Sequence, residues 1–263
     1  MAFCPCVALV MVFSRDPTIA GANASPPPSQ GTLHHIPPST SPEGPGPRCL
    51  RWGMARTRIK VCGIRDEDAL FAASDSGADA VGFMFVPSSP RFISPEDAFD
   101  LMSRLPPLVA SVGVFADHSA DEFADIEQVC PTSYSQLHGR EDSKLVRACG
   151  PDVIKAVRFD PATIAADLQQ WGNMEEVAAI LIDGSSGGLG VAFDWNALAP
   201  LLEDCPKEVI LAGGLTPANV GEAIRACRPW AVDVSSGVER EKGVKDPSLI
   251  EAFCEAVREA DRT

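Results

Sequence analysis

Eight short apolar runs alternate with eight segments of helical apolar spacing between Arg58 and the C-terminus. Nearly all of these runs are continuous rather than broken by a polar residue at every second position, as is typical of parallel strands buried on both faces. A regular strand–helix alternation indicates a parallel sheet covered by helices. Eight units favour closure of that sheet into a (β/α)8 TIM barrel, which we predict for residues 56–263.

The alternative α/β architecture is an open dinucleotide-binding sheet. No Gly-x-Gly-x-x-Gly motif follows the first apolar run, so that fold lacks its main sequence support. The predicted strands cover 58–64, 80–86, 108–115, 133–137, 152–159, 178–182, 208–211 and 230–234. The predicted helices cover 66–76, 94–105, 120–129, 143–148, 162–171, 195–202, 217–227 and 247–260.

Two strand-to-loop corners near the C-terminus predict a phosphate site, because barrels of this type bind phosphate after their last two strands. Glycine lets backbone N–H groups approach an anion closely. A helix N-terminus, predicted here with Thr216 as cap and Pro217 as first residue, adds a partial positive charge. Two ordinary turns are the alternative. The corner residues are Gly213, Gly214, Ser235, Ser236 and Gly237.

The net charge of −14 and the isoelectric point of about 4.7 argue against nucleic acid or an anionic membrane as a general partner. Backbone amides and a few arginines can still bind a small anion locally. Hydrophobic residues make up 45% of the 263 residues, enough for one large domain with a full core. We expect a small phosphorylated molecule as partner, and a monomer in preference to a homodimer.

Residues 1–55 differ in composition from the rest of the chain. They contain 10 of the 23 prolines and no sustained apolar periodicity, so we predict a disordered leader. The apolar run from Met1 to Phe13 is too short to span a bilayer, and no basic residue precedes it as in a signal peptide. The favoured interpretation is a translation start at Met54, ahead of a dispensable tail and of a targeting peptide.

The nine cysteines are odd in number and show no Cys-x-x-Cys spacing. Neither a disulfide framework nor a zinc site is therefore indicated, and no metal or cofactor is predicted. We expect most of these cysteines to be small buried hydrophobic residues in a reducing cytoplasm.

Polar residues at the carboxyl ends of the predicted strands define a candidate site, since barrel enzymes place their active sites there. Cys62 ends the first strand near Lys60, and a thiol can act as general base if its pKa falls toward neutrality. A core cysteine is the alternative. Asp183 ends the sixth strand, where a partly buried carboxyl can donate a proton or can instead cap the following loop.

Three further polar residues belong to the same rim. Arg91 can hold a carboxylate with its planar fork, or can pair with Glu96 or Asp97 on the surface. His138 can position a substrate hydroxyl or make a structural hydrogen bond to a neighbouring loop. Asp233 can hold sugar hydroxyls or orient the phosphate loop.

Seven short motifs, which follow one another along the chain, together resemble the phosphoribosylanthranilate isomerase family of tryptophan biosynthesis. The resemblance runs from about Arg58 to Val257, whereas the leader has no counterpart in it. Each motif alone is weak, but the ordered set is specific. The motifs are Lys60-Val-Cys-Gly-Ile64, Gly82-Phe-Met-Phe with Ser89-Pro-Arg91, Gln136-Leu-His-Gly139, Leu181-Ile-Asp183, Phe193-Asp-Trp195, Leu211–Val220 and Val232–Glu239.

The resemblance implies an Amadori rearrangement of N-(5-phosphoribosyl)anthranilate to 1-(2-carboxyphenylamino)-1-deoxyribulose 5-phosphate without a cofactor. It implies that Asp183 protonates the ribose ring oxygen and that Cys62 then removes the proton from C2. Arg91 would hold the anthranilate carboxylate. The glycine-rich corners, with Gly188 and Gly190 of the sixth loop, would hold the phosphate.

One position departs from the family pattern. The sixth loop of the family usually reads Gly-Gly-Thr-Gly, and Leu189 stands here in place of the threonine. The lost hydroxyl is expected to weaken substrate binding, whereas the backbone amides remain and activity should persist.

Two other functions remain open at this point. Another phosphate-binding isomerase or epimerase of sugar phosphates would share the last two corners, but it would usually need metal ligands or paired acids. A non-catalytic barrel that binds phosphorylated metabolites or a protein is disfavoured by the presence of Cys62 and Asp183.

We predict that the leader is dispensable, because its composition is that of a disordered segment and the first strand starts after Met54. A chain that begins at Met54 should equal the full chain in Tm, measured by circular dichroism, and in kcat/KM. A clear loss of either quantity would show that residues 1–53 contribute to the folded enzyme.

Overall fold

The computed structural model describes residues 56–184 and 193–263. The predictions for residues 1–55, and those for Gly188, Leu189 and Gly190 of the sixth loop, lie outside the described residues.

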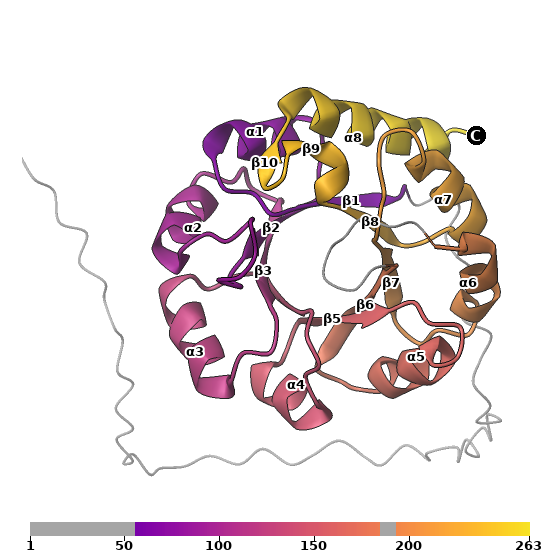
Figure 1. Ribbon diagram of the computed structural model, residues 1–263, viewed down its shortest axis with the longest axis horizontal. Helices are drawn as coiled ribbons and strands as arrows, with labels where there is room; N and C mark the ends of the chain where they lie inside the picture. The colour runs from indigo at the N-terminus through magenta and orange to yellow at the C-terminus, as the bar shows by residue number, and fades with distance from the viewer. Residues whose placement is uncertain (1–55, 185–192) are drawn as a thin grey trace, which may run out of the picture. The chain divides into compact units, whose positions relative to one another are not determined.

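Eight parallel strands form a closed barrel in which each strand pairs with the next one in sequence (Figure 1). The strands are β1 Arg58–Cys62, β2 Ala80–Met84, β3 Ala110–Phe115, β4 Tyr134–Leu137, β5 Val153–Arg158, β6 Val177–Asp183, β7 Glu208–Leu211 and β8 Ala231–Val234. Pairing of β1 with β8 closes the barrel and sets Arg58 opposite Ala231 and Lys60 opposite Asp233. The predicted (β/α)8 TIM barrel is thus confirmed.

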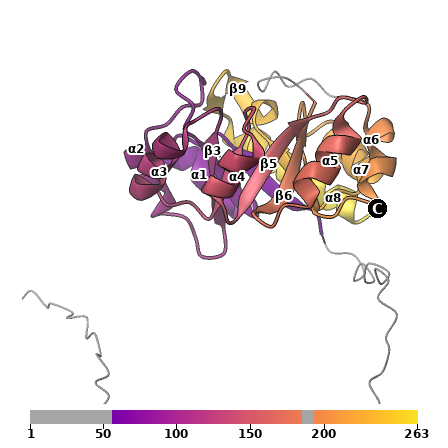
Figure 2. The same cartoon turned by 90° about the horizontal axis from the view of Figure 1, so that it is seen from below.

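A helix follows each strand and packs on the outside of the barrel (Figures 1 and 2). Several helices begin where a side chain accepts a hydrogen bond from a backbone N–H of the first turn, as Asp66, Ser94 and Ser119 do. The helices are α1 Glu67–Asp75, α2 Pro95–Met102, α3 Ala120–Val129, α4 Ser143–Cys149, α5 Ile164–Gly172, α6 Trp195–Leu202, α7 Val220–Cys227 and α8 Pro247–Asp261.

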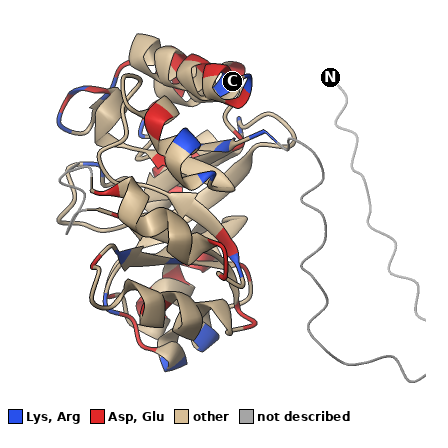
Figure 3. Cartoon of the chain, turned by 90° about the vertical axis from the view of Figure 1, so that its right-hand side faces the viewer, with Lys and Arg blue, Asp and Glu red and all other residues tan. Residues whose placement is uncertain are grey.

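Acidic residues lie on helices as well as on loops (Figure 3). The first turns of α1, α2 and α3 each contain two of them, and a negative charge at a helix N-terminus interacts favourably with the helix dipole. Part of the net negative charge therefore stabilises the fold locally. No helix within 56–184 or 193–263 is long and apolar enough to cross a membrane.

Small apolar side chains fill the barrel interior. Side chains two positions apart on a strand face the same side of a sheet. Asp183 and Asp233 therefore point inward one layer above Leu181 and Ala231, nearer the carboxyl ends of the strands. The interior cluster consists of Val112, Ile154, Ala156, Ala179, Leu181, Ile210, Ala212 and Ala231.

A second and larger core lies between the barrel strands and the surrounding helices, where residues such as Phe83, Leu70 and Phe253 are fully buried. The six cysteines in the described residues are all buried and none forms a disulfide, as expected for small hydrophobic side chains.

The prediction that Thr216 caps the seventh helix was wrong by three residues. The N-cap is Asn219, and α7 begins at Val220. The side chain of Asn219 accepts a hydrogen bond from Thr216 N at 2.7 Å and donates one to Gly214 O at 2.9 Å. These two bonds close a turn across the loop, and this turn delays the start of the helix.

Sequence patterns did not predict the short hairpin that follows β8. A 3₁₀ turn at Ser236–Val238 leads into β9 (Glu239–Glu241), which pairs with the antiparallel β10 (Val244–Lys245). The hairpin lies on the side of the barrel opposite the N-termini of the strands (Figure 2). It is too short and too rich in charged residues to give a strand signal.

Candidate active site

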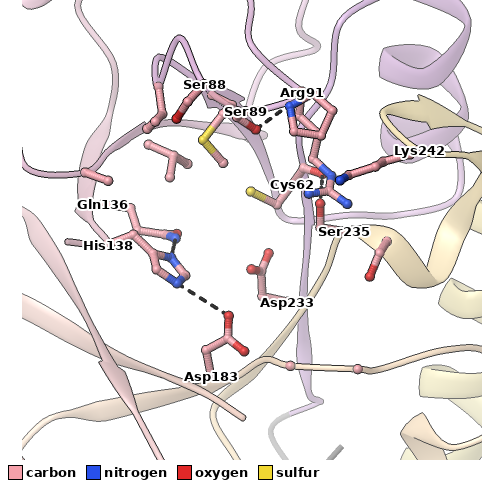
Figure 4. A pocket seen from close by; sticks show the side chains of 18 of the residues that line it. Cys62, Ser88, Ser89, Arg91, Gln136, His138, Asp183, Asp233, Ser235 and Lys242 are labelled. Atoms are coloured by element: carbon pink, nitrogen blue, oxygen red, sulfur yellow. Dashed lines mark hydrogen bonds and ion pairs between the residues drawn. The ribbon is translucent and has the colours of Figure 1, made fainter. Parts of the chain in front are cut away.

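A cavity of about 370 Å³ opens at the carboxyl ends of the strands (Figure 4). The structure brings together there most of the residues that sequence analysis selected from six different loops and strand ends. Those that line the cavity are Cys62, Arg91, His138, Asp183, Gly213, Gly214, Asp233, Ser235 and Ser236. Gly188 and Gly190 lie outside the described residues.

In each of the two glycine corners, the loops after β7 and β8, a glycine allows another segment of the backbone to approach closely. Gly213 has a φ of +86°, and a Cβ there would lie 2.7 Å from Asp183 Oδ1 and still closer to the backbone of Gly184. Gly237, in contrast, does not line the cavity. It packs against the carbonyl oxygen of Leu215, so its contribution is to hold the two corners against each other.

Cys62 ends β1 with its sulfur directed into the cavity (Figure 4). On the same face of the strand, the buried Lys60 donates from Nζ to Asp233 Oδ1 at 2.9 Å. Burial raises the pKa of the Cys62 thiol above its usual value, although the ammonium group of Lys60 acts in the opposite direction. A role as general base requires this pKa to fall toward neutrality, and in the unliganded site burial outweighs the neighbouring cation and opposes that fall.

Asp183 lies beside His138 in the cavity wall, with 3.4 Å between His138 Nε2 and Asp183 Oδ2 (Figure 4). His138 Nδ1 lies 2.9 Å from Nε2 of Gln136. With the amide of Gln136 in this orientation its nitrogen donates to Nδ1, which corresponds to the imidazole tautomer with a proton on Nε2, facing Asp183. The side chain of His138 thus bonds within the site and not to a neighbouring loop.

Arg91 is buried and does not pair with Glu96 or Asp97. Its Nε and Nη2 atoms donate to the two carboxylate oxygens of Glu239 at 2.7 and 3.0 Å. This bidentate pair occupies one side of the guanidinium fork. The edge formed by Nη1 and Nη2 remains for a second planar anion.

Glu239 and Lys245 connect the hairpin to the end of β1. Lys245 Nζ donates to Glu239 Oε1 and to Ser235 O, each at 2.9 Å, and the hydroxyl of Ser235 donates to Cys62 O at 3.0 Å. Burial alone would raise the pKa of Glu239, but the hydrogen bond from Arg91 and the charge of Lys245 lower it to about 2.

An apolar wall lies between the polar groups of the cavity. Met84, Val86, Val114 and Ala116 of the second and third strands and their loops form it. This wall offers an apolar surface in the same cavity as the guanidinium of Arg91.

Sequence analysis did not select four buried residues that support the site. Gln136 orients His138, Lys60 pairs with Asp233, and Glu239 with Lys245 fixes Arg91. Gln136 and Lys60 were within reach of sequence reasoning, because each lies on a strand two positions before a selected residue, His138 and Cys62 respectively. Across residues 56–184 and 193–263, no group of three His, Cys, Asp or Glu side chains is placed to hold a metal ion.

The lowered pKa of Glu239 predicts a specific acid dependence of stability. A carboxylate whose pKa falls on folding stabilises the protein above its unfolded pKa, and this contribution is lost as the pH falls through the folded value. The fall of the Glu239 pKa from 4.5 to about 2 corresponds to on the order of 3 kcal/mol of unfolding free energy. The difference in unfolding free energy between wild type and Glu239→Gln should therefore shrink between about pH 5 and pH 2.

Urea unfolding at stepped pH measures this difference. Glu241→Gln is the matched control, because Glu241 is an exposed carboxylate of the same hairpin. The control difference should stay nearly constant with pH. A constant difference for Glu239→Gln as well would show that the Glu239 carboxylate is not stabilised by its buried partners.

Residues 59–256 match the family model described as N-(5'phosphoribosyl)anthranilate (PRA) isomerase. The chain is 44% identical over 214 residues to the N-(5'-phosphoribosyl)anthranilate isomerase of Leptothrix cholodnii, covering 79% of this chain and 93% of that protein. It is 41% identical over 212 residues to the protein of the same name from Dechloromonas aromatica, covering 79% and 99%.

Solved structures show the same relationship. Phosphoribosyl anthranilate isomerase from Thermotoga maritima superposes with a TM-score of 0.69 at 40% identity, and the match covers 77% of this chain and 99% of that one. The corresponding protein from Thermus thermophilus gives a TM-score of 0.70 at 34% identity with the same coverage. The chain therefore belongs to the phosphoribosylanthranilate isomerase family.

Proposed function

We propose that this cavity carries out the Amadori rearrangement of N-(5-phosphoribosyl)anthranilate with Asp183 as general acid and Cys62 as general base. The observation that carries the proposal is that both groups line one cavity, between an arginine at one side and two glycine corners at another. One similar solved structure, with a TM-score of 0.67 and 39% identity, is a complex with reduced 1-(o-carboxyphenylamino)-1-deoxyribulose 5-phosphate. This ligand has the two anionic groups that the cavity is suited to bind.

Ring opening is the first step. Asp183 donates its proton to the ribose ring oxygen, the bond between that oxygen and C1 breaks, and the nitrogen lone pair forms a protonated Schiff base with C1. His138 supports this step, because its Nε2–H faces the carboxylate that Asp183 becomes.

Proton abstraction is the second step. The thiolate of Cys62 removes the proton from C2, and the electrons of that C–H bond form a C1–C2 double bond while the nitrogen becomes neutral. The enolamine then loses its hydroxyl proton and gains one at C1, which gives the ketone. The cationic Schiff base favours the thiolate at this stage and so counteracts the effect of burial on the Cys62 pKa.

Each end of the substrate has its own binding region. The Nη1–Nη2 edge of Arg91 holds the anthranilate carboxylate, and the aromatic ring lies against the wall that contains Met84 and Val114. Gly213, Gly214 and the serines after β8 hold the phosphate, and Asp233 is placed to accept hydrogen bonds from ribose hydroxyls.

The cellular setting and the assembly of the enzyme are further parts of this proposal. We place the reaction in the cytoplasm and expect a monomer, which sedimentation of the full chain measures. A variant structure in this family is described as monomers generated from a dimeric protein of Thermotoga maritima, so a homodimer is the specific alternative.

Removal of the Arg91 guanidinium should weaken substrate binding. Arg91→Ala should raise KM and lower kcat/KM by an amount equivalent to about 2–4 kcal/mol, the range for cutting one partner of a buried charged pair. Arg91→Lys should restore only part of this loss, because an ammonium group lacks the planar fork.

Steady-state kinetics with a fluorescence assay of conversion tests this expectation. Arg104→Ala is the control, because Arg104 is half exposed and pairs with Glu67 away from the cavity. Unchanged kinetics in a folded Arg91→Ala variant would place the carboxylate site elsewhere.

The acid–base pair predicts a bell-shaped pH profile of kcat/KM, because activity needs Cys62 deprotonated and Asp183 protonated. Coupled groups share macroscopic pKa values, so the two limbs are assigned with single variants. Cys62→Ser replaces the thiol by a far weaker acid, and Asp183→Asn cannot donate the proton. Each should lower kcat by at least about 10²-fold with the far-UV circular dichroism unchanged.

Cys130→Ser is the matched control for Cys62→Ser, because Cys130 is a buried cysteine that does not line the cavity. It should lower Tm and leave kcat nearly unaltered. Full kcat in a folded Cys62→Ser variant would remove Cys62 from the mechanism, and a loss of Tm alone in Asp183→Asn would make Asp183 a structural residue.

A further inference from the structure

Arg91 is held in one orientation by a buried carboxylate from a distant part of the chain. An arginine side chain has several rotatable bonds, and its free guanidinium would sample many directions. Here Nε and Nη2 donate to Oε1 and Oε2 of Glu239 at 2.7 and 3.0 Å, and both side chains are at least nine-tenths buried. This fork-to-fork geometry fixes the plane of the guanidinium as well as its position.

Glu239 has no acceptor capacity left for a substrate or for proton transfer. Oε1 also accepts from Lys245 Nζ at 2.9 Å, and Oε2 also accepts from the backbone N–H of Gly243 at 3.1 Å. Each oxygen thus has two donors, which is the usual limit for a carboxylate oxygen. Glu239 can therefore affect the reaction only through the side chains that it binds, Arg91 and Lys245.

The stem of Arg91 is confined on the side of Cys62. A Cβ at Gly63 would lie 2.8 Å from Cδ of Arg91, so the methylene groups of the arginine pack directly on this glycine. Figure 4 shows Arg91 beside Cys62 and Ser235 at the same side of the cavity. The carboxylate of Glu239 and the backbone of Gly63 hold the arginine between them.

The cluster of Arg91, Glu239 and Lys245 combines two cations with one anion in a buried place. One positive charge therefore exceeds the negative charge within the cluster. Lys245 is turned toward Glu239 and Ser235, whereas Arg91 lines the cavity. An anion that enters the cavity therefore meets the excess positive charge at the guanidinium of Arg91. A ligand with a single carboxylate at that end is complementary in charge.

We propose that Glu239 is a positioning residue that orients Arg91 and thereby makes the enzyme selective for an aryl group bearing a carboxylate. This inference rests on the proposed role of Arg91 as the carboxylate anchor. It extends that role, because selectivity then depends on a residue of the β9–β10 hairpin that does not touch the substrate.

The test compares two substrates that differ only in the carboxylate: N-(5-phosphoribosyl)anthranilate and N-(5-phosphoribosyl)aniline. Single-turnover rates with the full chain in excess, followed by chromatography of the product, give kcat/KM for each. Their quotient is the carboxylate selectivity. The variants are Arg91→Ala, Glu239→Gln and Glu239→Asp, and Glu241→Gln is the control that removes an exposed charge from the same hairpin.

Wild type should prefer the anthranilate substrate by at least about 10-fold, the lower end for a hydrogen bond between charged groups. Arg91→Ala should abolish most of this selectivity. Glu239→Gln should reduce it by at least about 5-fold, through a lower kcat/KM of the anthranilate substrate, and Glu241→Gln should leave it unchanged. The double variant of Arg91→Ala and Glu239→Gln should be no less selective than Arg91→Ala alone, because the two residues act as one unit.

A merely structural role for Glu239 predicts a different result. Both substrates would then lose the same factor of kcat/KM, the selectivity of Glu239→Gln would equal that of wild type, and the proposal would be overturned. If Arg91→Ala itself keeps full selectivity, the proposed carboxylate site is wrong instead, and the inference about Glu239 falls with it.

Glu239→Asp keeps the test decisive if Glu239→Gln does not fold. It retains the charge that Lys245 needs, but the side chain is one methylene shorter and cannot bridge both nitrogens of Arg91. Lower selectivity in a folded Glu239→Asp variant supports the positioning role. Wild-type selectivity in that variant contradicts it.

Discussion

Closure of the barrel between its first and last strands is the constraint on which the site depends. The register of this seam sets Lys60 of β1 opposite Asp233 of β8, and their side chains form a buried ion pair with 2.9 Å between Nζ and Oδ1. Burial of either charge alone would be costly, whereas the pair satisfies both. Burial opposes the charge of Lys60, but Asp233 outweighs it and raises the pKa of the lysine. The lysine thus remains a cation directly below Cys62.

A second set of buried charges extends from this seam to the rim. Ser235 follows β8 and donates to Cys62 O, while Lys245 bonds to Ser235 and to Glu239. Glu239 in turn holds Arg91, which belongs to the loop after β2. Three segments that are distant in sequence are joined in this way. The hairpin that supplies Glu239 and Lys245 therefore fixes Arg91 relative to β1, the strand that carries Cys62.

The fold was readable from the sequence because its signals are local. Continuous apolar runs gave the eight strands, and Asp66 and Ser94 gave helix starts that the structure has. Pairs of side chains that are distant in sequence could not be predicted. Arg91 and Glu239 lie 148 residues apart, so no rule of sequence spacing connects them. The sequence offered only the nearby carboxylates of Glu96 and Asp97 as partners for Arg91. The start of α7 was missed for a related reason, since the side chain of Asn219 closes a turn that propensity alone does not show.

The direction of the Cys62 pKa shift could not be predicted from the sequence either, and it bears on how Cys62 would act as the proposed base. The sequence shows Lys60 nearby, a cation that lowers a thiol pKa, but it does not show the burial of Cys62, which outweighs that charge and raises the pKa. A thiolate with a higher pKa is a stronger base once it forms, but less of it is present at neutral pH. In the proposed mechanism the ring-opened substrate resolves this conflict, because its protonated Schiff base would place a positive charge beside the sulfur only after Asp183 has acted. Acid catalysis by Asp183 would thus generate the condition that Cys62 needs, and the order of the two steps follows from the electrostatics of the cavity.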